Sequence, residues 1–250
     1  MKVSIITVSL NSADNIEACI RSVIGQTHRE IEHISVDGRS GDGTLDVIEK
    51  YRDHFAARLC EKDGGIYEAM NKGLALAGGE LVGFLNSDDV YAADDIIARV
   101  VEVAAEGSLD SCYGDIVYVD PKDSGRAIRY WKAGPFDLGN IEKGWMPPHP
   151  AFFVRRSIYR RFGGFNLAFP VVADYEIMLR FLYKHRVSSG YLPRVILHKR
   201  TGGISKPTPL NVLRNNAACR KAWIANGLSP SRGIFVRKVL SKLGQLRPLP

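Results

Sequence analysis

The sequence predicts an α/β fold in which a mostly parallel sheet is flanked by helices on both faces. The first observation behind this prediction is the order of segments in residues 1–106, where short apolar runs alternate with amphipathic stretches of helical period. The second is that the apolar runs are continuous, as strands buried on both faces require. The third is the shortness of the links, which is typical of strands and helices that follow each other directly in space.

Each element of this first half has its own signature. The expected strands are residues 3–10, 34–36, 57–60 and 81–85. The expected helices begin after Ser12, which can cap the first of them, and cover residues 44–55, 66–76 and 91–105. Residues 37–43 hold three glycines in seven positions, which indicates a sharp turn or a loop that approaches a ligand closely.

After residue 106 the pattern changes. Residues 111–119 and 127–132 alternate like antiparallel strands, and the further expected elements are a strand at 191–197 and helices at 155–162, 173–183, 210–226 and 234–243. Residues 134–150 are rich in glycine and proline, and a loop of this length is often a lid or a binding loop. We therefore divide the chain into an α/β half (1–106), a second half of the same domain (107–205) and a basic helical extension (206–250).

Charge is distributed unevenly along the chain. The formal net charge is +7, yet the last acidic residue is Glu176, and residues 177–250 contain 15 Lys and Arg. Such a basic end could face nucleic acid, an anionic membrane or diphosphate groups. Nucleic acid is disfavoured, because the basic residues are not interleaved with aromatic ones and no reading motif is present.

The compartment can also be inferred from the sequence. No apolar run approaches the roughly 20 residues that span a bilayer, and the N-terminus becomes polar too soon for a signal peptide. The four cysteines are scattered without a CxxC pair, which favours buried free thiols over a zinc site or disulfides. These features predict a cytoplasmic protein.

Polar side chains follow four successive predicted strands. They are Asn11, Asp37, Asp63 and the run Asn86-Ser87-Asp88-Asp89. Because ligands of parallel sheets bind beyond the carboxyl ends of the strands, we expect these side chains to meet at one site. Plainer alternatives are a turn role for Asp37 and helix capping for Asp88 or Asp89. The loop after Asp37 has neither GK[ST] nor GxGxxG, which argues against a nucleotide triphosphatase and a dehydrogenase.

Three kinds of side chain could carry chemistry. Asp88 and Asp89 repel each other unless a cation lies between them, and Mg²⁺ or Mn²⁺ that also binds phosphates is a natural partner. Asp174 could act as a general base, although helix capping explains Asp174, and a helix-dipole contact explains Glu176, equally simply. His149 and His198 are candidates as well, but a lone histidine more often has a structural role.

Four segments carry a resemblance to a known family. They are SIITVSLNSADNIEACIRSVIGQT, VDGRSGDGT, EKDGGIYEAMNKGLALAGGELVGFLNSDD and ADYEIMLR. In this order the chain resembles the inverting family-two glycosyltransferases of bacterial exopolysaccharide, colanic acid and O-antigen synthesis. The resemblance implies the GT-A fold. Residues 1–106 would then be a Rossmann-like half that binds a nucleotide sugar, and residues 107–205 would hold the acceptor-side strands and the catalytic base.

The resemblance also implies roles for particular residues. The donor-binding positions are Asn11, Asp37, Asp63, Asn86, Ser87 and Asp88, of which the last three occupy the family's DxD position. Asp174 matches the catalytic base. The metal ligands would be Asp88 with Asp89 and His198, and the acceptor side would hold Trp145, His149 and Glu176. Two positions depart from the family: Gly38 stands where a second acid is usual, and Asn86 replaces the first acid of DxD without its charge.

The expected function is inverting transfer of a sugar from a nucleotide diphosphate sugar, with UDP the commonest choice, to a lipid-linked or oligosaccharide acceptor. The cofactor would be Mg²⁺ or Mn²⁺, and the process cell-surface polysaccharide synthesis. The alternative is a non-catalytic nucleotide-sugar-binding or scaffold protein. Residues 234–243 can form a basic amphipathic helix suited to the inner face of the cell membrane, or a helix packed on the domain, or a disordered tail.

Overall fold

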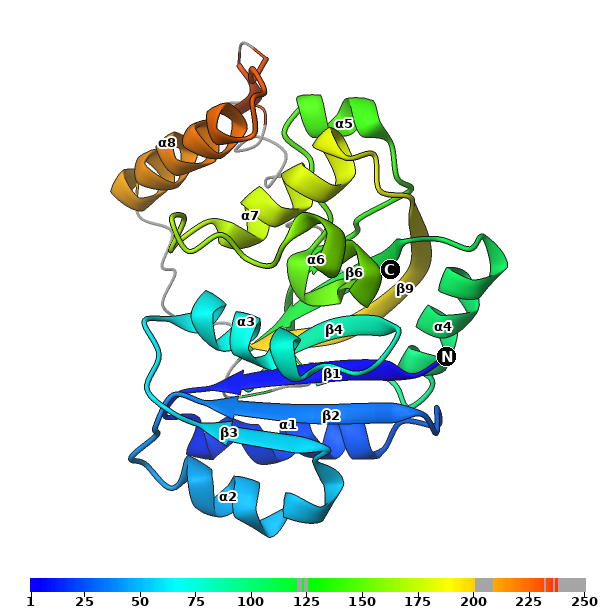
Figure 1. Ribbon diagram of the computed structural model, residues 1–250, viewed down its shortest axis with the longest axis vertical. Coiled ribbons are helices and arrows are strands. Elements are labelled where there is room, and N and C mark those ends of the chain that lie inside the picture. The colour runs from blue at the N-terminus through cyan, green and yellow to red at the C-terminus, as the bar shows by residue number, and fades with distance from the viewer. Residues whose placement is uncertain (121–122, 124–125, 201–208, 232, 236, 238–250) are drawn as a thin grey trace.

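The structure is a computed structural model that describes residues 1–120, 123, 126–200, 209–231, 233–235 and 237. Its nine strands form one sheet in the order β3-β2-β1-β4-β8-β6-β9-β5, with β7 paired to β6 outside this path (Figure 1). Strands from both predicted halves therefore belong to one continuous sheet.

The parallel part of the sheet confirms the predicted α/β fold. It consists of β1 (Val3–Ser9), β2 (Ile31–Asp37), β3 (Ala57–Cys60) and β4 (Leu81–Asn86). The helices between and after these strands are α1 (Ala13–Ile24), α2 (Thr44–Lys50), α3 (Ile66–Leu76) and α4 (Ile96–Glu106). Because the four strands are parallel, their carboxyl ends lie at one edge of the sheet.

Helices cover both faces of this sheet. On β1, Val3 and Ile5 join one buried cluster with residues of α1 and α4, whereas Ile6 and Val8 join another with residues of α3. Successive side chains of a strand point to opposite faces, so a continuous apolar strand supplies both clusters. Helix α3 lies very close to β1 at Gly73, where an added Cβ would lie 2.4 Å from a methyl carbon of Ile6.

The second half adds strands of both directions. They are β6 (Ser111–Val119), β7 (Ala127–Trp131), β8 (Phe152–Arg155) and β9 (Ser189–Arg200). Strand β6 pairs antiparallel with β7, as predicted, and with β8, but parallel with β9. Strand β8 in turn pairs antiparallel with β4, and this pairing joins the two halves.

Several expected boundaries are corrected. The helix expected from residue 91 begins at Ile96, because β5 (Asp89–Tyr91) pairs with β9 instead. The expected helix 44–55 ends at Lys50 and is followed by a 3-10 turn (Arg52–His54). The expected loop 134–150 contains α5 (Leu138–Glu142), and a 3-10 turn (His149–Ala151) begins within it. Strand β8 was missed because four residues carry little periodicity.

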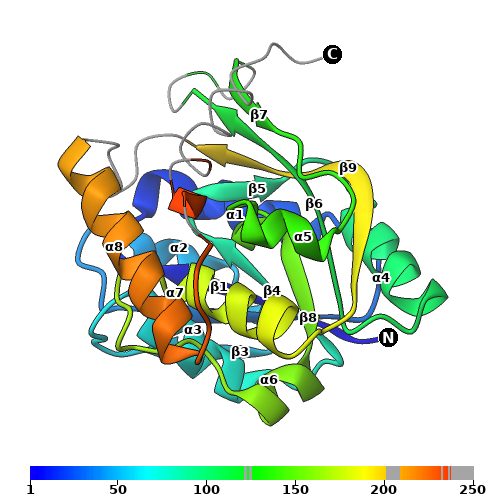
Figure 2. The same cartoon turned by 90° about the horizontal axis from the view of Figure 1, so that it is seen from above.

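The remaining helices cover one face of the second half. They are α6 (Arg156–Phe162), α7 (Ala173–Met178), which continues as a π-helix (Leu179–Lys184), and α8 (Pro209–Ala225). Helix α8 lies beside α7 (Figure 2). The expected helix 234–243 falls mostly outside the described residues. None of the helices in the described part of the chain has the length and hydrophobicity needed to cross a bilayer.

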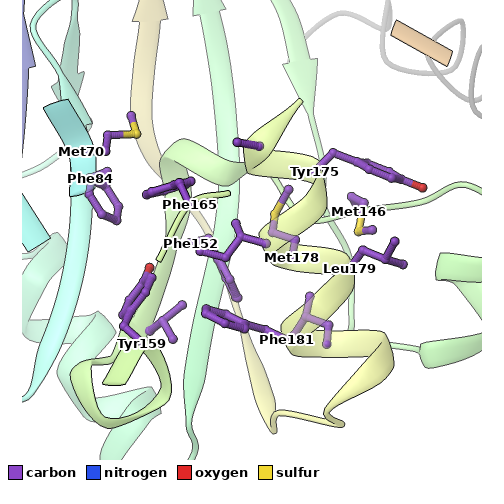
Figure 3. Packing of buried hydrophobic residues seen from close by; sticks show 14 of the residues in the cluster. Met70, Phe84, Met146, Phe152, Tyr159, Phe165, Tyr175, Met178, Leu179 and Phe181 are labelled. Atoms are coloured by element: carbon purple, nitrogen blue, oxygen red, sulfur yellow. The ribbon is translucent and has the colours of Figure 1, made fainter. Parts of the chain in front are cut away.

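An aromatic cluster fixes α7 against the sheet (Figure 3). Phe84 of β4 contacts Phe165 edge to face, with ring centroids 5.2 Å apart. On the other side of the cluster, Tyr159 of α6 contacts Phe181 in the same manner at 5.4 Å. Offset and edge-to-face aromatic contacts of this kind add to the stabilisation from burial. The first turn of α7, which carries Asp174, is therefore held in a defined position.

Candidate active site

The junction of β4 and β5 presents one free carboxylate. Asn86 Nδ2 donates to Asp89 Oδ2 at 3.1 Å, and Ser87 Oγ donates to Ser12 Oγ at 2.8 Å. Asp88 is partly exposed, and no residue in the described part of the chain donates a hydrogen bond to its carboxylate. In addition, the buried Asn86 Oδ1 has no hydrogen-bond partner among the described residues. Asp88 is therefore free to bind a ligand.

Asp89 has a different partner from the metal ion that we expected. Its carboxylate is buried and lies 3.3 Å from Lys199 Nζ, in register across the β5–β9 pair. Burial raises the pKa of Asp89 to about 6, although the charge of Lys199 opposes this shift. Burial alone would lower the pKa of Lys199, but the charges of Asp89 and Asp88 raise it overall. The fixed cation thus compensates Asp89, which corrects its assignment as a metal ligand.

Asp174 is held by its own helix and lies beside α3. Its Oδ1 accepts a hydrogen bond from the backbone N–H of Tyr175 at 2.8 Å. Tyr67 on α3 lies close to Asp174, because the pKa of Tyr67 is raised by burial first and then by the charge of Asp174. The Tyr67 ring stacks on Phe165, with centroids 5.5 Å apart. Asp174 is therefore a partly exposed carboxylate that is held by the backbone of its own helix and lies beside an anchored tyrosine.

The β4–β5 junction and the start of α7 belong to one electrostatic region. Burial raises the pKa of Tyr118 on β6, and the charges of both Asp89 and Asp174 raise it further. Burial lowers the pKa of His149. The charge of Asp174 opposes this shift, and the charge of Lys199 adds to it. Because charge effects of this kind weaken with distance, Tyr118 and His149 each lie within electrostatic range of Asp174 and of a member of the Asp89–Lys199 ion pair. Asp88 is adjacent to Asp89 in the sequence.

The two expected acceptor residues of the long loop are buried or partly buried. His149 is 9% exposed and stacks on Phe84, with ring centroids 5.9 Å apart. Trp145 is partly buried, and its Nε1–H donates to the carbonyl oxygen of Ala133 at 2.9 Å. Both rings therefore hold the loop 134–150 in place.

Glu176 is structural in this arrangement. Its carboxylate pairs with Arg180 at 3.0 Å and accepts a hydrogen bond from Asn226 Nδ2 at 3.0 Å. The side chain is almost fully buried. A carboxylate that is buried and paired in this way does not reach an acceptor, and the expected acceptor contact of Glu176 is corrected accordingly.

The expected nucleotide contacts lie at the ends of β1, β2 and β3. The buried Asp37 carboxylate accepts hydrogen bonds from Ser9 Oγ at 2.6 Å and from the backbone N–H of Ser40 at 2.7 Å, as in the turn alternative. Asn11 Oδ1 accepts from Gly41 N–H at 3.0 Å. Asp63 faces the same loop, because a Cβ added to Gly38 would lie 2.9 Å from its Oδ2. These residues shape the loop 37–43 beside the site.

Comparison with known proteins identifies the family. The description of the matching family is "Glycosyl transferase family 2", and the match covers residues 4–163. The chain belongs to this family. It is accordingly a glycosyltransferase, and its α/β sheet with flanking helices is the GT-A fold of the family's structural neighbours. The match ends before Asp174 and His198, so it does not test their roles.

Curated relatives and solved structures agree with this family. The glycosyltransferase is 32% identical to a PGL/p-HBAD biosynthesis glycosyltransferase of Mycobacterium tuberculosis, over 81% of this chain and 78% of the relative. It is similar to TarS of S. aureus in complex with UDP, with a TM-score of 0.73, 20% identity and coverage of 96% of this chain and 71% of TarS. It is also similar to a mannosyltransferase of Pyrobaculum calidifontis in complex with GDP-Man and Mn²⁺, with a TM-score of 0.61, 16% identity and coverage of 96% and 73%.

A divalent cation fits this glycosyltransferase only in part. Mg²⁺ is often bound through one or two carboxylates together with substrate phosphates, and Asp88 offers one free carboxylate. The described residues contain no group of three or more His, Cys, Asp or Glu side chains that could hold a metal ion. The three expected ligands, Asp88, Asp89 and His198, therefore do not form a metal site without further ligands. His198 is half-buried, and burial lowers its pKa. Any metal would therefore be bound by Asp88 jointly with the donor.

Sequence reasoning missed two contributors to the site. Tyr67 lies within a segment that resembles the family, but nothing in its spacing showed that it reaches Asp174. Lys199 belongs to the basic end of the chain, and nothing in the sequence showed that it pairs with Asp89. Both contacts join residues more than 100 positions apart, and no local pattern in a single sequence reports such pairs.

Proposed function

We propose that this glycosyltransferase transfers a sugar, with inversion, from a nucleotide diphosphate sugar to a hydroxyl group of a cell-surface glycan acceptor. The observation that supports the proposal is the presence of two partly exposed carboxylates. Asp88 follows β4, and Asp174 lies in the first turn of α7, where the Tyr175 N–H holds it. The printed names of relatives agree, since they include a PGL/p-HBAD and a putative teichuronic acid biosynthesis enzyme. Structural neighbours are complexes with UDP, UDP-GlcNAc and GDP-Man.

In the proposed reaction Asp174 accepts the proton of the acceptor hydroxyl. The acceptor oxygen forms a bond to the anomeric carbon as the bond from that carbon to the diphosphate oxygen breaks, and the nucleoside diphosphate leaves. Tyr67 lies beside the Asp174 carboxylate, and Phe165 holds Tyr67 by stacking. General-base catalysis requires this fixed geometry more than it requires a large pKa shift.

The donor would lie between loop 37–43 and Asp88. A divalent cation bound there would supply positive charge to the departing diphosphate. Asn86 would contribute hydrogen bonds without charge, because an amide is neutral. The polar ends of β1 and β2 position the loop for the nucleoside, through Ser9, Asp37 and Ser40.

A substitution that removes the base tests this proposal. Asp174→Asn should lower kcat by about a thousandfold, because the amide cannot take the proton, while the Kd for the nucleoside diphosphate stays within about twofold. Asp53→Asn is the matched control, since Asp53 is an exposed acid in the 3-10 turn after α2. Transfer is measured by mass spectrometry of products and nucleotide binding by calorimetry.

The outcomes separate the alternatives. Near-normal turnover of Asp174→Asn would reject Asp174 as the base. Nucleotide binding without transfer by the unmodified protein, across a panel of nucleotide sugars and acceptors, would instead support a non-catalytic sugar-nucleotide-binding role.

A further inference from the structure

The segment between α6 and α7 exposes aliphatic side chains beside the site. Residues 163–172 read Gly-Gly-Phe-Asn-Leu-Ala-Phe-Pro-Val-Val and contain no charged residue. Leu167 is 51% exposed and Val171 is 59% exposed, among the highest values for large apolar side chains in the described residues. Val171 lies three positions before Asp174. Exposed aliphatics in one short loop indicate an interaction site more than scattered ones do.

This segment is anchored and ordered rather than loosely exposed. Asn71 of α3 clamps it, because its Nδ2 donates to the carbonyl oxygen of Phe165 and its Oδ1 accepts from the Phe165 N–H, both at 2.8 Å. The Phe165 ring is buried against Tyr67. The backbone N–H groups of Ala168 and Phe169 bond to Asn166. The exposure of Leu167 and Val171 is thus imposed by the fold.

Helix α8, which packs beside α7, presents a mixed apolar and basic face. The exposed residues lie on one helical face; they are Leu213, Arg214, Ala217, Arg220, Lys221, Ile224 and Ala225. The helix contains no Asp or Glu. Its opposite face is held on α7, because Trp223 Nε1–H donates to the Tyr175 hydroxyl at 2.8 Å. Figures 1 and 2 both show the segment that precedes α7 running beside α8.

We infer that Leu167, Val171 and the exposed face of α8 form a docking surface for an anionic lipid bilayer. Aliphatic side chains that enter the headgroup region, with Lys and Arg beside them, are the pattern of interfacial membrane binding. Long basic side chains can cover the apolar surface with their stems and place their charges among phosphate groups. The absence of acidic residues from both sequence segments fits a negatively charged partner.

This inference rests on the proposed function, to which it adds the place of the acceptor. If the segment 163–172 enters the bilayer surface, Asp174 lies at that surface, where the hydroxyl of a lipid-linked acceptor is held. A free oligosaccharide would not need this surface. The inference also places membrane contact on the folded domain, rather than on residues 234–243.

A local fluorescent reporter tests the docking surface. The full-length protein carries Cys60→Ser, which removes the exposed cysteine, and Leu167→Cys labelled with the fluorophore NBD. Vesicles contain phosphatidylcholine alone or with about 30% phosphatidylglycerol. We expect NBD emission to shift to the blue and brighten only with the anionic vesicles. The matched control is NBD at Leu45→Cys, an exposed leucine of α2, which should not respond.

Two variants complete the test. Leu167→Ser/Val171→Ser should weaken vesicle partition about tenfold, and Leu45→Ser/Leu76→Ser should leave it unchanged, although both pairs replace exposed aliphatics. Arg214→Gln/Arg220→Gln/Lys221→Gln should abolish the preference for anionic vesicles. An unresponsive probe at position 167 while the protein still binds vesicles, equal responses at 167 and 45, or no vesicle binding at all would each overturn the inference.

The result does not depend on the transfer reaction. Vesicle binding is measured without donor, and nucleotide binding is measured separately by calorimetry. A protein that binds vesicles through position 167 but does not transfer sugar would contradict the proposed function alone. A protein that transfers sugar but fails the vesicle test would contradict the docking surface alone.

Discussion

At the scale of single residues, the two adjacent acids after β4 have different environments. Asp88 is partly exposed and accepts no hydrogen bond from the described residues, whereas Asp89 is buried against Lys199. Buried charges need a partner, and removing one member of a pair costs more than removing both. The pair also supports the hydrogen bond from Asn86 to Asp89. Lys199 thereby helps to hold the segment 86–88 in place through Asp89.

A double-mutant cycle tests this pair. Lys199→Met should lower the free energy of unfolding by about 3 kcal/mol at pH 8, and Asp89→Asn/Lys199→Met should recover at least about half of that loss. The folded-state pKa of Asp89 is raised to about 6, so below that pH the folded protein binds a proton on Asp89 and the ion pair is lost. The cost of Lys199→Met should therefore be smaller at pH 5 than at pH 8. Additive effects in urea unfolding, or an equal cost at both pH values, would contradict the pairing.

At the scale of elements, the sequence predicted the parallel half better than the second half. The helix at 66–76 and the short strand at 57–60 were predicted with the observed bounds, as was the strand at 111–119 in the second half, because their apolar pattern and the turn residues that flank them are local in the sequence. Strand β5 could not be predicted in this way. Its three residues form a strand only because β9 pairs with them, and β9 lies about a hundred positions later.

The same limit applies to the site. Asp88 and Asp174 were assigned from strand ends and from the family resemblance, and their roles stay predictions. The pairing of Glu176 with Arg180 is local in sequence, but its burial comes from α8, through Asn226. A single sequence does not reveal that α8 packs on α7 and buries Glu176. For that reason Glu176 looked like a site residue and is part of the core.

Helix α8 provides a prediction at this scale, because two adjacent residues have opposite environments. Trp223 is 1% exposed and Ile224 is 61% exposed. Trp223→Ala should lower the free energy of unfolding by about 3 kcal/mol, as it removes a buried aromatic ring and the hydrogen bond from its Nε1–H to the Tyr175 hydroxyl. Ile224→Ala, the control, should change it by less than about 0.5 kcal/mol. Similar effects of the two substitutions in denaturant unfolding would show that α8 does not pack on α7 through Trp223.

At the scale of the whole molecule, one continuous sheet joins the two halves of the site. Strand β4 ends at Asn86, and Ser87 and Asp88 follow it directly. Strand β4 pairs with β8, which in turn pairs with β6. Strand β9, beside β6, brings Lys199 to Asp89. On the face of the sheet, α3 and α7 meet through Tyr67 and Asp174. One sheet and the helices on its face thus connect the strand that precedes Asp88 to the helix that carries Asp174.

The most direct test of this account is a crystal structure of the protein with a bound nucleoside diphosphate and Mn²⁺. We expect the terminal phosphate beside the Asp88 carboxylate and the Asp174 carboxylate facing the open space next to that phosphate, within about 10 Å, where a sugar ring would lie. Phosphates bound away from Asp88, or Asp174 on the far side of a wall of side chains from them, would contradict the shared site.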